Sequence, residues 1–325
     1  MKQKCYSVAL CTYNGEKYIE DQLNSILNQS VLPCEIIISD DGSNDNTLIL
    51  VNNILKKSNI FYRIVKNYKK KGVTANFSNA ISLCTGEYIF TSDQDDVWMS
   101  NKAESIINIF ESNSKALLVF SNGELVDQDL HLLHCAMWES VGITTHMLRE
   151  NKWFEYLLNR CLVTGAAMAF RRELFQKDEM IPSSWLHDGW LAWKAVAKDG
   201  LVPCEEKLIL YRQHGNNVVG MNNVTLKRRI KKYIRNFKNI QETHIIRYQR
   251  YKDLETYLSN NFSDVENNKL QNCILFWKDM VNSDKEKSRF KKLKIIIEHV
   301  LNGDFDKYFN GKKGALREIL LALFY

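Results

Sequence analysis

Three carboxylates lie close together in residues 92–98, which read SDQDDVW. Asp93, Asp95 and Asp96 come directly after YIFTS, a short apolar run that we expect to form a buried strand. Carboxylates packed this closely raise one another's pKa unless a cation neutralises them. Because carboxylate and phosphate oxygens are the usual ligands of Mg²⁺ and Mn²⁺, the pattern favours a divalent metal site over a solvated acidic turn.

A D-x-D sequence is also typical of phosphatases that use an aspartate as the nucleophile. Those enzymes carry it after the first strand of their sheet, whereas the first apolar run of this chain ends in TYNGE. The position of the motif in the chain therefore argues against a phosphatase.

A second polar cluster, DDGSND at 40–45, follows the apolar run EIIIS. Its composition is typical of a turn, and Asp45 is suited to cap the helix that follows. Asp40 and Asp41 can also accept hydrogen bonds from the N3–H of a pyrimidine base and from ribose hydroxyls. The spacing does not choose between these two carboxylates.

The elements around these clusters decide where they lie. The predicted strands are 7–12, 35–39, 61–65, 88–92 and 116–121, and the predicted helices are 16–28, 45–55 and 73–84. Their alternation predicts an α/β fold with a mainly parallel sheet and helices on both faces. Ligands bind at the carboxyl ends of such strands, and the clusters at 12–16, 40–45 and 93–96 lie there.

The second half of the chain is less regular. We expect a buried strand with a glycine break over 161–170, a helix over 189–198 and a short strand over 207–211. From about Val224 onward the chain is predicted to be helical and is basic. We therefore place one domain over residues 1–222 and a helical C-terminal region over 223–325.

Three stretches in this order, CTYNGEKYI, EIIISDDGSNDNT and GEYIFTSDQDDVW, resemble the inverting family 2 glycosyltransferases, which have the GT-A nucleotide-sugar-binding fold. The resemblance covers roughly residues 7 to 220. It implies that the nucleotide is held by Thr12, Tyr13, Asp40 and Asp41. It also implies that Asp93 and Asp95 hold Mg²⁺ or Mn²⁺ and the sugar diphosphate, with Asp95 as the direct metal ligand, and that Asp96 faces the donor sugar or the start of the next helix.

The resemblance extends to WLHDGWLAW at 185–193. It places the general base at Asp188, whose carboxylate would take the proton from an acceptor hydroxyl. The same residue can cap the helix expected from Gly189. Trp185 and Trp190 would form a stacking wall for a sugar ring or belong to the core.

In YRQHGNN at 211–217, Arg212 and His214 would close over the diphosphate, or His214 would complete the metal shell. A lone His more often makes a local hydrogen bond. Gly165, in LVTGAAMAF, would admit the acceptor or serve only for packing.

SDQDDVW, HDGW and the His214 loop together are similar to family members that transfer rhamnose, so the expected donor is dTDP-rhamnose. The expected acceptor is a hydroxyl of a growing cell-surface polysaccharide or a lipid-linked glycan. The Q-x-x-R-W element of processive members is not found in this sequence, which favours transfer of single residues.

Two other functions remain as alternatives. A sugar nucleotidyltransferase needs a Gly-rich basic loop after the first strand, and TYNGE offers one Gly, followed by Lys17. A catalytically dead binding or scaffold protein would be expected to lack Asp95 or Asp188, and both are present.

The composition of the chain limits the compartment in which the protein works and the partners that it can bind. The chain starts without a signal-peptide pattern and has no apolar run of about 18 residues, so we expect a cytoplasmic protein without a transmembrane helix. The eight Cys are scattered singly, which predicts reduced core residues instead of disulfides or a metal site.

The net charge of +6 is concentrated at 227–238 and 285–294, near apolar helical stretches at 293–301 and 316–325. Such helices suit peripheral contact with the anionic inner face of a cell membrane, although a solvated helix face is the alternative. No nucleic-acid-binding motif accompanies the charge, and the sequence does not specify an oligomeric state.

Overall fold

The computed structural model describes residues 5–67, 72–176, 179–214 and 237–324, without the side chains of 237–239 and 324. The chain forms two compact units, residues 1–151 with 163–221 and residues 152–162 with 222–325. The predicted boundary near residue 222 and the basic run 227–238 fall in or next to the segment 215–236, which lies outside the described residues. Segment 152–162, which we predicted in the first domain, belongs to the helical unit.

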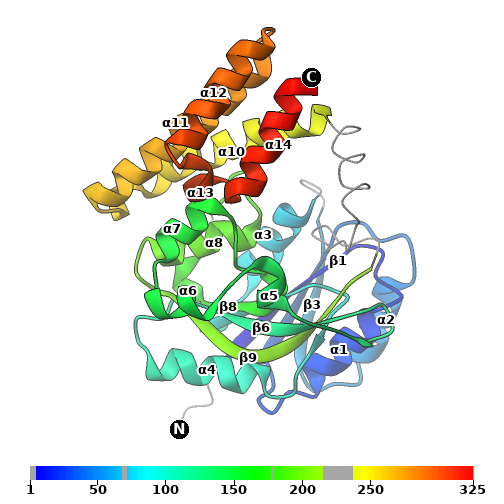
Figure 1. Cartoon of the computed structure of the whole chain (residues 1–325). Helices are drawn as coiled ribbons and strands as arrows, with labels where there is room; N and C mark the ends of the chain where they lie inside the picture. Colours follow the sequence, from blue (N-terminus) through cyan, green and yellow to red (C-terminus); the bar gives the residue numbers. More distant parts are fainter. Residues whose placement is uncertain (1–4, 68–71, 177–178, 215–236, 325) are drawn as a thin grey trace. The chain divides into compact units, whose positions relative to one another are not determined.

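The first unit is built on a sheet with the strand order β3-β2-β1-β4-β8-β6-β9-β5, and β7 pairs with β6 (Figure 1). The strands are β1 (Tyr6–Thr12), β2 (Glu35–Asp40), β3 (Phe61–Lys66), β4 (Tyr88–Ser92), β5 (Val97–Trp98), β6 (Leu118–Val126), β7 (Leu132–Ala136), β8 (Met168–Arg171) and β9 (Leu201–Arg212). The first four in the order are parallel, and β9 is parallel to β6, whereas β8 runs antiparallel to β4 and β6. The α/β class and the mostly parallel sheet are confirmed.

Helices of the first unit connect these strands. They are α1 (Ile19–Leu27), α2 (Thr47–Leu55), α3 (Val73–Leu83), α4 (Lys102–Ser112), α5 (Met137–Val141), α6 (Thr145–Glu150) and α8 (His187–Val196), with 3-10 turns η1 (Gly165–Ala167) and η2 (Arg172–Leu174). In α1 the buried residues Ile19, Leu23 and Ile26 recur at helical spacing and so form one apolar face. Strands β1 and β2 are buried over their whole length, as expected of central parallel strands.

Three differences between the predicted and the observed elements affect residues of the predicted site or their neighbours. The strand predicted over 161–170 is the turn η1 followed by β8, because the Thr91 hydroxyl donates to the Gly165 carbonyl and holds a turn there. Helix α2 begins at Thr47 with Asn46 at its cap position, although Asp45 still accepts from the Thr47 N–H at 3.0 Å. Helix α8 begins earlier than predicted, which places Asp188 inside its first turn.

The cysteines were expected to be mostly reduced core residues, whereas Cys5 and Cys34 form a disulfide with Cα atoms 5.4 Å apart. The register Ser7↔Glu35 places the residues before β1 and β2 side by side. The two cysteines are 29 positions apart in the sequence, so no local pattern indicates that they are close. Cys11, Cys84 and Cys204 are free and buried, as predicted.

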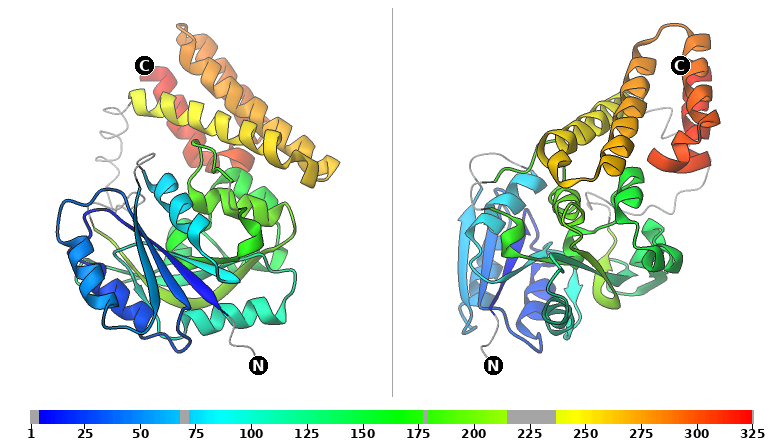
Figure 2. Two further views of the ribbon diagram at one scale, coloured as in Figure 1. Left: turned by 180° about the vertical axis from the view of Figure 1, so that it is seen from behind. Right: turned by 90° about the vertical axis from the view of Figure 1, so that its left-hand side faces the viewer.

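The second unit is helical. Its elements are α7 (Trp153–Asn159), α10 (Phe237–Leu258), η3 (Ser259–Asn261), α11 (Asp264–Lys285), α12 (Arg289–Leu301), α13 (Asp304–Tyr308) and α14 (Gly311–Phe324). Helices α10 and α11 pack side by side (Figure 2). The Phe154 ring of α7 meets the Phe262 ring at 5.1 Å, and the Tyr251 hydroxyl donates to the Leu158 carbonyl at 2.6 Å. These contacts explain why segment 152–162 belongs to this unit. No helix in the described part of the chain is long and apolar enough to cross a bilayer.

A buried charged cluster joins α10, α11 and α14. His244 is fully buried, with its Nδ1 2.9 Å from Asp284 Oδ2 and its Nε2 3.5 Å from Glu318 Oε1. The Arg317 guanidinium donates to the same Glu318 carboxylate. Burial alone would lower the pKa of His244, but the hydrogen bonds to Asp284 and Glu318 outweigh it and raise the pKa. Burial alone would raise the pKa of Glu318, but His244 and Arg317 lower it.

This cluster makes the stability of the helical unit depend on pH. A raised folded-state pKa means that the contribution of His244 is fully present below its ordinary pKa of 6.5 and is lost as the pH rises through the raised value. Glu318 acts in the opposite sense, because its contribution is present above its ordinary pKa of 4.5 and is lost as the pH falls through the lowered value.

We therefore expect the thermal unfolding midpoint to fall when the pH is raised from about 6 to about 9, because His244 then loses its charge in the folded state. Circular dichroism at the helical minimum measures it. The His244→Phe variant cannot ionise at this position and should lose most of the fall. An equal fall in the variant would assign the pH dependence to other groups.

Candidate functional site

One edge of the sheet collects the predicted site residues. Strands β1, β2, β4 and β9 end at this edge, and β8 starts there because it runs in the opposite direction. Thr12 and Asp40 end β1 and β2, Asp93 follows β4, and Arg212 ends β9. The turn η1, which contains Gly165, precedes β8. Five regions of the sequence therefore meet at one edge.

Asp40 holds the turn after β2. Its Oδ2 accepts from the Gly42 N–H at 3.0 Å and the Ser43 N–H at 2.9 Å, and its Oδ1 accepts from the Thr12 hydroxyl at 2.9 Å. Asp40 and Thr12 are both buried. Their polar atoms are thus engaged with each other and with the turn.

Asp41 and Tyr13 are more accessible than their neighbours. The Asp41 carboxylate, which is half-buried, accepts from Asn67 Nδ2 at 3.0 Å and from the Gly72 N–H at 2.8 Å. The Tyr13 side chain is 54% exposed. Of the four residues expected to hold the nucleotide, these two present side chains that a ligand can reach.

Gln94 joins the loop after β1 to the loop after β4. Its Oε1 accepts from the Tyr13 N–H at 2.8 Å, and its Nε2 donates to the Tyr13 carbonyl at 3.0 Å. A Cβ added at Gly15 would lie 2.2 Å from Gln94 Oε1, so the contact requires glycine there. The sequence analysis did not identify Gln94 as a residue of the site, although its position between Asp93 and Asp95 indicated that it lies there.

The three carboxylates of the acidic loop lie in different environments. Burial raises the pKa of Asp93, the charges of Asp95 and Asp188 raise it further, and Lys102 acts in the opposite direction. Asp96 is almost fully buried, and burial followed by the charges of Asp95 and Asp93 raises its pKa. Its Oδ1 accepts from the Arg212 N–H at 2.9 Å, and its place beside a donor sugar or the start of the next helix stays a prediction.

Lys102 is a buried cation beneath these carboxylates. Its Nζ donates to the Ala166 carbonyl at 2.7 Å and lies 4.1 Å from the centre of the Trp98 ring. Burial lowers the pKa of Lys102 to about 7, although the charges of Asp96 and Asp93 oppose the shift. Sequence reasoning missed this residue as well. Its spacing from the buried Ile106 and Phe110 of α4 indicates a lysine on the apolar face of a helix.

His214 and Asp95 form a pair, with His214 Nε2 2.8 Å from Asp95 Oδ2. The His214 ring also stacks on the ring of Tyr18, with centroids 4.9 Å apart. The pair places an imidazole beside the predicted metal ligand.

The Arg212 guanidinium is buried among protein groups. It donates to the Asp95 carbonyl at 2.7 Å, to Asp21 Oδ2 at 2.9 Å and to the Gln128 carbonyl. It also lies 4.5 Å from the centre of the Tyr18 ring. Arg212 therefore ties the acidic loop to α1 and to the segment after β6, and its contact with a diphosphate stays a prediction.

Asp188 lies at the same edge, in the first turn of α8. Its Oδ1 accepts from the Gly189 N–H at 2.6 Å, and its Oδ2 accepts from the Gly165 N–H at 3.2 Å. It is close enough to Asp93 for its charge to raise the pKa of that residue. The structure thus brings Asp188, Gly165 and the acidic loop together.

His187 supports this turn from inside. Burial lowers the pKa of His187 to about 4, with the charge of Asp188 opposing, so the ring is neutral. It stacks on Phe77 with centroids 3.7 Å apart, and a Cβ at Gly165 would lie 2.5 Å from its Nε2. Gly165 therefore permits a close approach between η1 and α8.

The two candidate stacking residues lie in the core. Trp185 and Trp190 are buried with ring centroids 6.2 Å apart, and Trp190 Nε1 donates to Glu179 Oε1 at 3.2 Å. Of the two roles predicted from the sequence, the structure shows packing.

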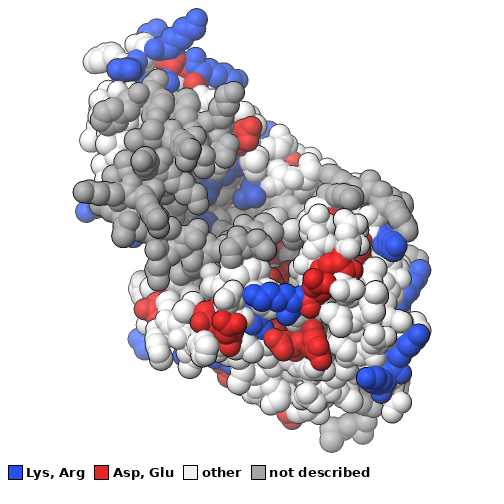
Figure 3. All heavy atoms as spheres, turned by 90° about the vertical axis from the view of Figure 1, so that its right-hand side faces the viewer, with Lys and Arg blue, Asp and Glu red and all other residues white. Residues whose placement is uncertain are grey.

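Among the described residues, no group of three or more His, Cys, Asp or Glu side chains is arranged to hold a metal ion. The surface of the first unit has negatively and positively charged side chains close together: Figure 3 shows Asp and Glu side chains gathered beside Lys and Arg on one face. Within the described part of the site, the Asp95–His214 pair places a carboxylate oxygen beside an imidazole nitrogen.

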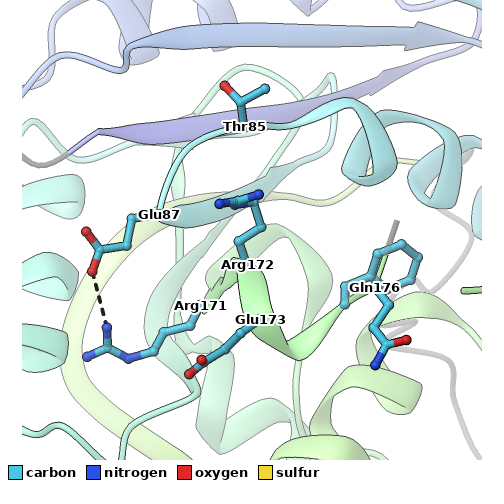
Figure 4. Close-up of a pocket in the computed structure, with 7 residues that line it drawn as sticks. Thr85, Glu87, Arg171, Arg172, Glu173 and Gln176 are labelled. Atoms are coloured by element: carbon cyan, nitrogen blue, oxygen red, sulfur yellow. Dashed lines mark ion pairs between the residues drawn. The ribbon is translucent and has the colours of Figure 1, made fainter. Parts of the chain in front are cut away.

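A cavity of about 750 Å³ lies at the opposite edge of the sheet (Figure 4). It is lined by Thr85, Glu87, Arg171, Arg172, Glu173, Phe175 and Gln176. Glu87 precedes β4 and pairs with Arg171, which ends β8, at 3.6 Å. This cavity contains none of the predicted site residues.

Replacing Arg212 by Met should lower the free energy of unfolding by about 3 kcal/mol or more, because buried carbonyl oxygens lose their donors. Urea unfolding measures the loss. The matched control is Asp21→Asn, which removes only the ion pair to a side chain that is 50% exposed and should cost about 1 kcal/mol or less. Equal losses in the two variants would mean that the ion pair, not the carbonyl contacts, stabilises the loop.

Comparison with known proteins identifies the family. Residues 7–178 match glycosyl transferase family 2. The dTDP-rhamnosyl transferase RfbG of Shigella flexneri is 28% identical, over 90% of this chain and 99% of the relative. The UDP-Glc:alpha-D-GlcNAc-diphosphoundecaprenol beta-1,3-glucosyltransferase WfgD of Escherichia coli is 28% identical, over 38% of this chain and 47% of the relative.

The fold is also found in a solved structure. S. aureus TarS in complex with UDP-GlcNAc superposes with a TM-score of 0.59 at 15% identity, over 84% of this chain and 72% of TarS. Because the family match spans more than half of the 325 residues and the fold agrees, the chain belongs to glycosyl transferase family 2 and is a glycosyltransferase.

Proposed function

We propose that this glycosyltransferase moves a single sugar, with inversion, from a nucleotide-sugar donor to a hydroxyl of a lipid-linked saccharide or growing cell-surface polysaccharide. The observation that carries the proposal is the convergence of Asp41, Asp95 and Asp188 at one edge of the sheet from three distant parts of the sequence. Such an edge is where ligands bind in open α/β sheets.

The nucleotide would lie against the loops after β1 and β2. Asp41 is the better candidate for the contact with the base or ribose, because Asp40 is buried and its oxygens are engaged in the turn. Tyr13 offers an exposed ring beside it. Thr12, Asp40 and Gln94 then act as positioning residues.

A divalent cation, Mg²⁺ or Mn²⁺, fits the acidic loop. The pKa of Asp93 stays raised although Lys102 is close, so this part of the site is short of positive charge. Asp95, with Asp93 or His214 as a second protein donor, would hold the ion, and oxygens of the donor diphosphate would complete its coordination. When bound, such an ion stabilises the negative charge of the leaving diphosphate.

Asp188 is proposed as the general base. Two backbone N–H groups fix its carboxylate, which restricts its orientation. In the reaction the acceptor oxygen bonds to the anomeric carbon, the bond from that carbon to the diphosphate oxygen breaks, and Asp188 takes the hydroxyl proton. The buried Arg212 donates to the Asp95 carbonyl and so positions the acidic loop, and the buried Lys102 donates to the Ala166 carbonyl in the turn before β8.

The donor is proposed to be dTDP-L-rhamnose. The relative RfbG, which carries that activity in its name, aligns with this chain over nearly its whole length. The relative WfgD is named for an acceptor linked to diphosphoundecaprenol, which supports a lipid-linked acceptor. An enzyme with such an acceptor would work at the inner face of the cell membrane.

Nucleotide release from a panel of dTDP-, UDP- and GDP-sugars tests this proposal. With Mg²⁺ or Mn²⁺ and a lipid-linked acceptor, we expect turnover of dTDP-rhamnose. Asp188→Asn keeps the size of the side chain but removes the base, so kcat should fall by about 10²–10⁴-fold with little change in the KM for the donor. Asp95→Asn should weaken the metal dependence.

Glu205→Gln is the matched control, because it makes the same chemical change at an exposed position of β9 and should leave turnover unchanged. Turnover of another donor would refute the rhamnose assignment and keep the mechanism. Turnover that is unchanged in Asp188→Asn would refute its role as base. Absence of turnover with every donor would favour a catalytically dead protein.

A further inference from the structure

Helix α12 exposes an apolar stripe to solvent. Phe290 is 79% exposed, Ile297 46% and Leu301 80%. Their spacings of seven and four residues place them on one face of the helix, while Lys292 and Ile296 of the same helix are buried. The outward face of α12 is therefore unusually apolar for a surface helix.

Basic side chains outnumber acidic ones along this stripe, and the exposed Glu298 lies 3.9 Å from Lys294. Residues 285–298 contain six Lys or Arg and two Glu. Lys291 and Lys294 are exposed on α12, one beside Phe290 and the other one turn along the stripe. Figure 3 shows blue Lys and Arg side chains gathered at the tip of the helical unit, where Figure 1 places the turn between α11 and α12.

Helix α14, which packs beside α12, repeats the pattern. Leu316, Leu320 and Leu323 are exposed at spacings of four and three residues, and the exposed Lys312 and Lys313 precede them. Each of two neighbouring helices therefore combines an exposed apolar stripe with lysines.

We propose that α12 and α14 form a docking surface for an anionic lipid bilayer. Apolar side chains flanked by lysines are the features by which a helix lies in the interface between lipid headgroups and acyl chains. The lysines then contact the negatively charged headgroups. The proposal rests on the proposed function only in that a lipid-linked acceptor would be reached at such a surface.

The charge also decides against a second copy of this chain as the occupant. A symmetric dimer would place the same face on both partners, because a two-fold interface uses one patch twice. The lysines of both copies would then face each other, which is unfavourable. An anionic surface complements the same charges.

Vesicle co-sedimentation of the full chain tests the proposal. The protein should bind vesicles that contain phosphatidylglycerol and bind pure phosphatidylcholine vesicles at least about tenfold less, since each lysine near an anionic surface contributes favourably. The double variant Phe290→Ser/Leu301→Ser should weaken binding by about tenfold or more through lost apolar burial. Lys291→Glu/Lys294→Glu should weaken it by about tenfold as well and remove its salt dependence.

The matched control is Phe61→Ser/Leu32→Ser, which makes the same changes at exposed positions of the first unit and should leave vesicle binding unchanged. Failure of the native protein to bind anionic vesicles would overturn the proposal. Unchanged vesicle binding in the α12 variants, with a change from dimer to monomer on size exclusion, would also overturn it and assign the surface to a second copy. Release of nucleotide from the donor is measured in parallel and should persist in every variant, so that failure of docking is distinguished from failure of the proposed function.

Discussion

The structure depends on how negative charge is accommodated at one edge of the sheet. Asp93, Asp95, Asp96 and Asp188 lie near one another there, and burial together with the neighbouring charges opposes the ionisation of Asp93 and Asp96. Two basic side chains are buried next to these carboxylates, and each donates hydrogen bonds to main-chain carbonyls. Lys102 donates to Ala166, and Arg212 donates to Asp95 and Gln128. Because a buried charge is costly without such partners, the carbonyl contacts keep the cations in place independently of any ligand.

The antiparallel strand β8 brings the second half of the chain to this edge. It lies between the parallel strands β4 and β6, so its first residues arrive where the neighbouring strands end. The turn before it contributes the Gly165 N–H to Asp188 and the Ala166 carbonyl to Lys102. One short turn therefore connects the proposed base to the cation beneath the acidic loop.

Much of this was predictable from local pattern. Strands β1, β2 and β4 are uninterrupted buried runs, and each is followed by a polar cluster, so the sequence alone indicates both the sheet and the edge where ligands bind. The contacts that fix the site were not predictable. The Gln94 bond to Tyr13 and the Arg212 bond to Asp21 join residues 81 and 191 positions apart, and no periodicity in the sequence reports such pairs. The pairing of Cys5 with Cys34 and the place of α7 in the helical unit escaped prediction for the same reason.

The helical unit shows why apolar spacing alone does not reveal which face of a helix is inside. Its interior contains the charged cluster of His244, Asp284 and Glu318, whereas α12 directs Phe290 and Leu301 outward. Helix α12 buries Lys292 and Ile296 but leaves the apolar area of Phe290 and Leu301 in contact with solvent. The buried ion pairs hold α10, α11 and α14 together through specific contacts, so the apolar residues on the outside are not required for that purpose. A second surface that covers Phe290 and Leu301 would bury the apolar area that the fold itself leaves exposed.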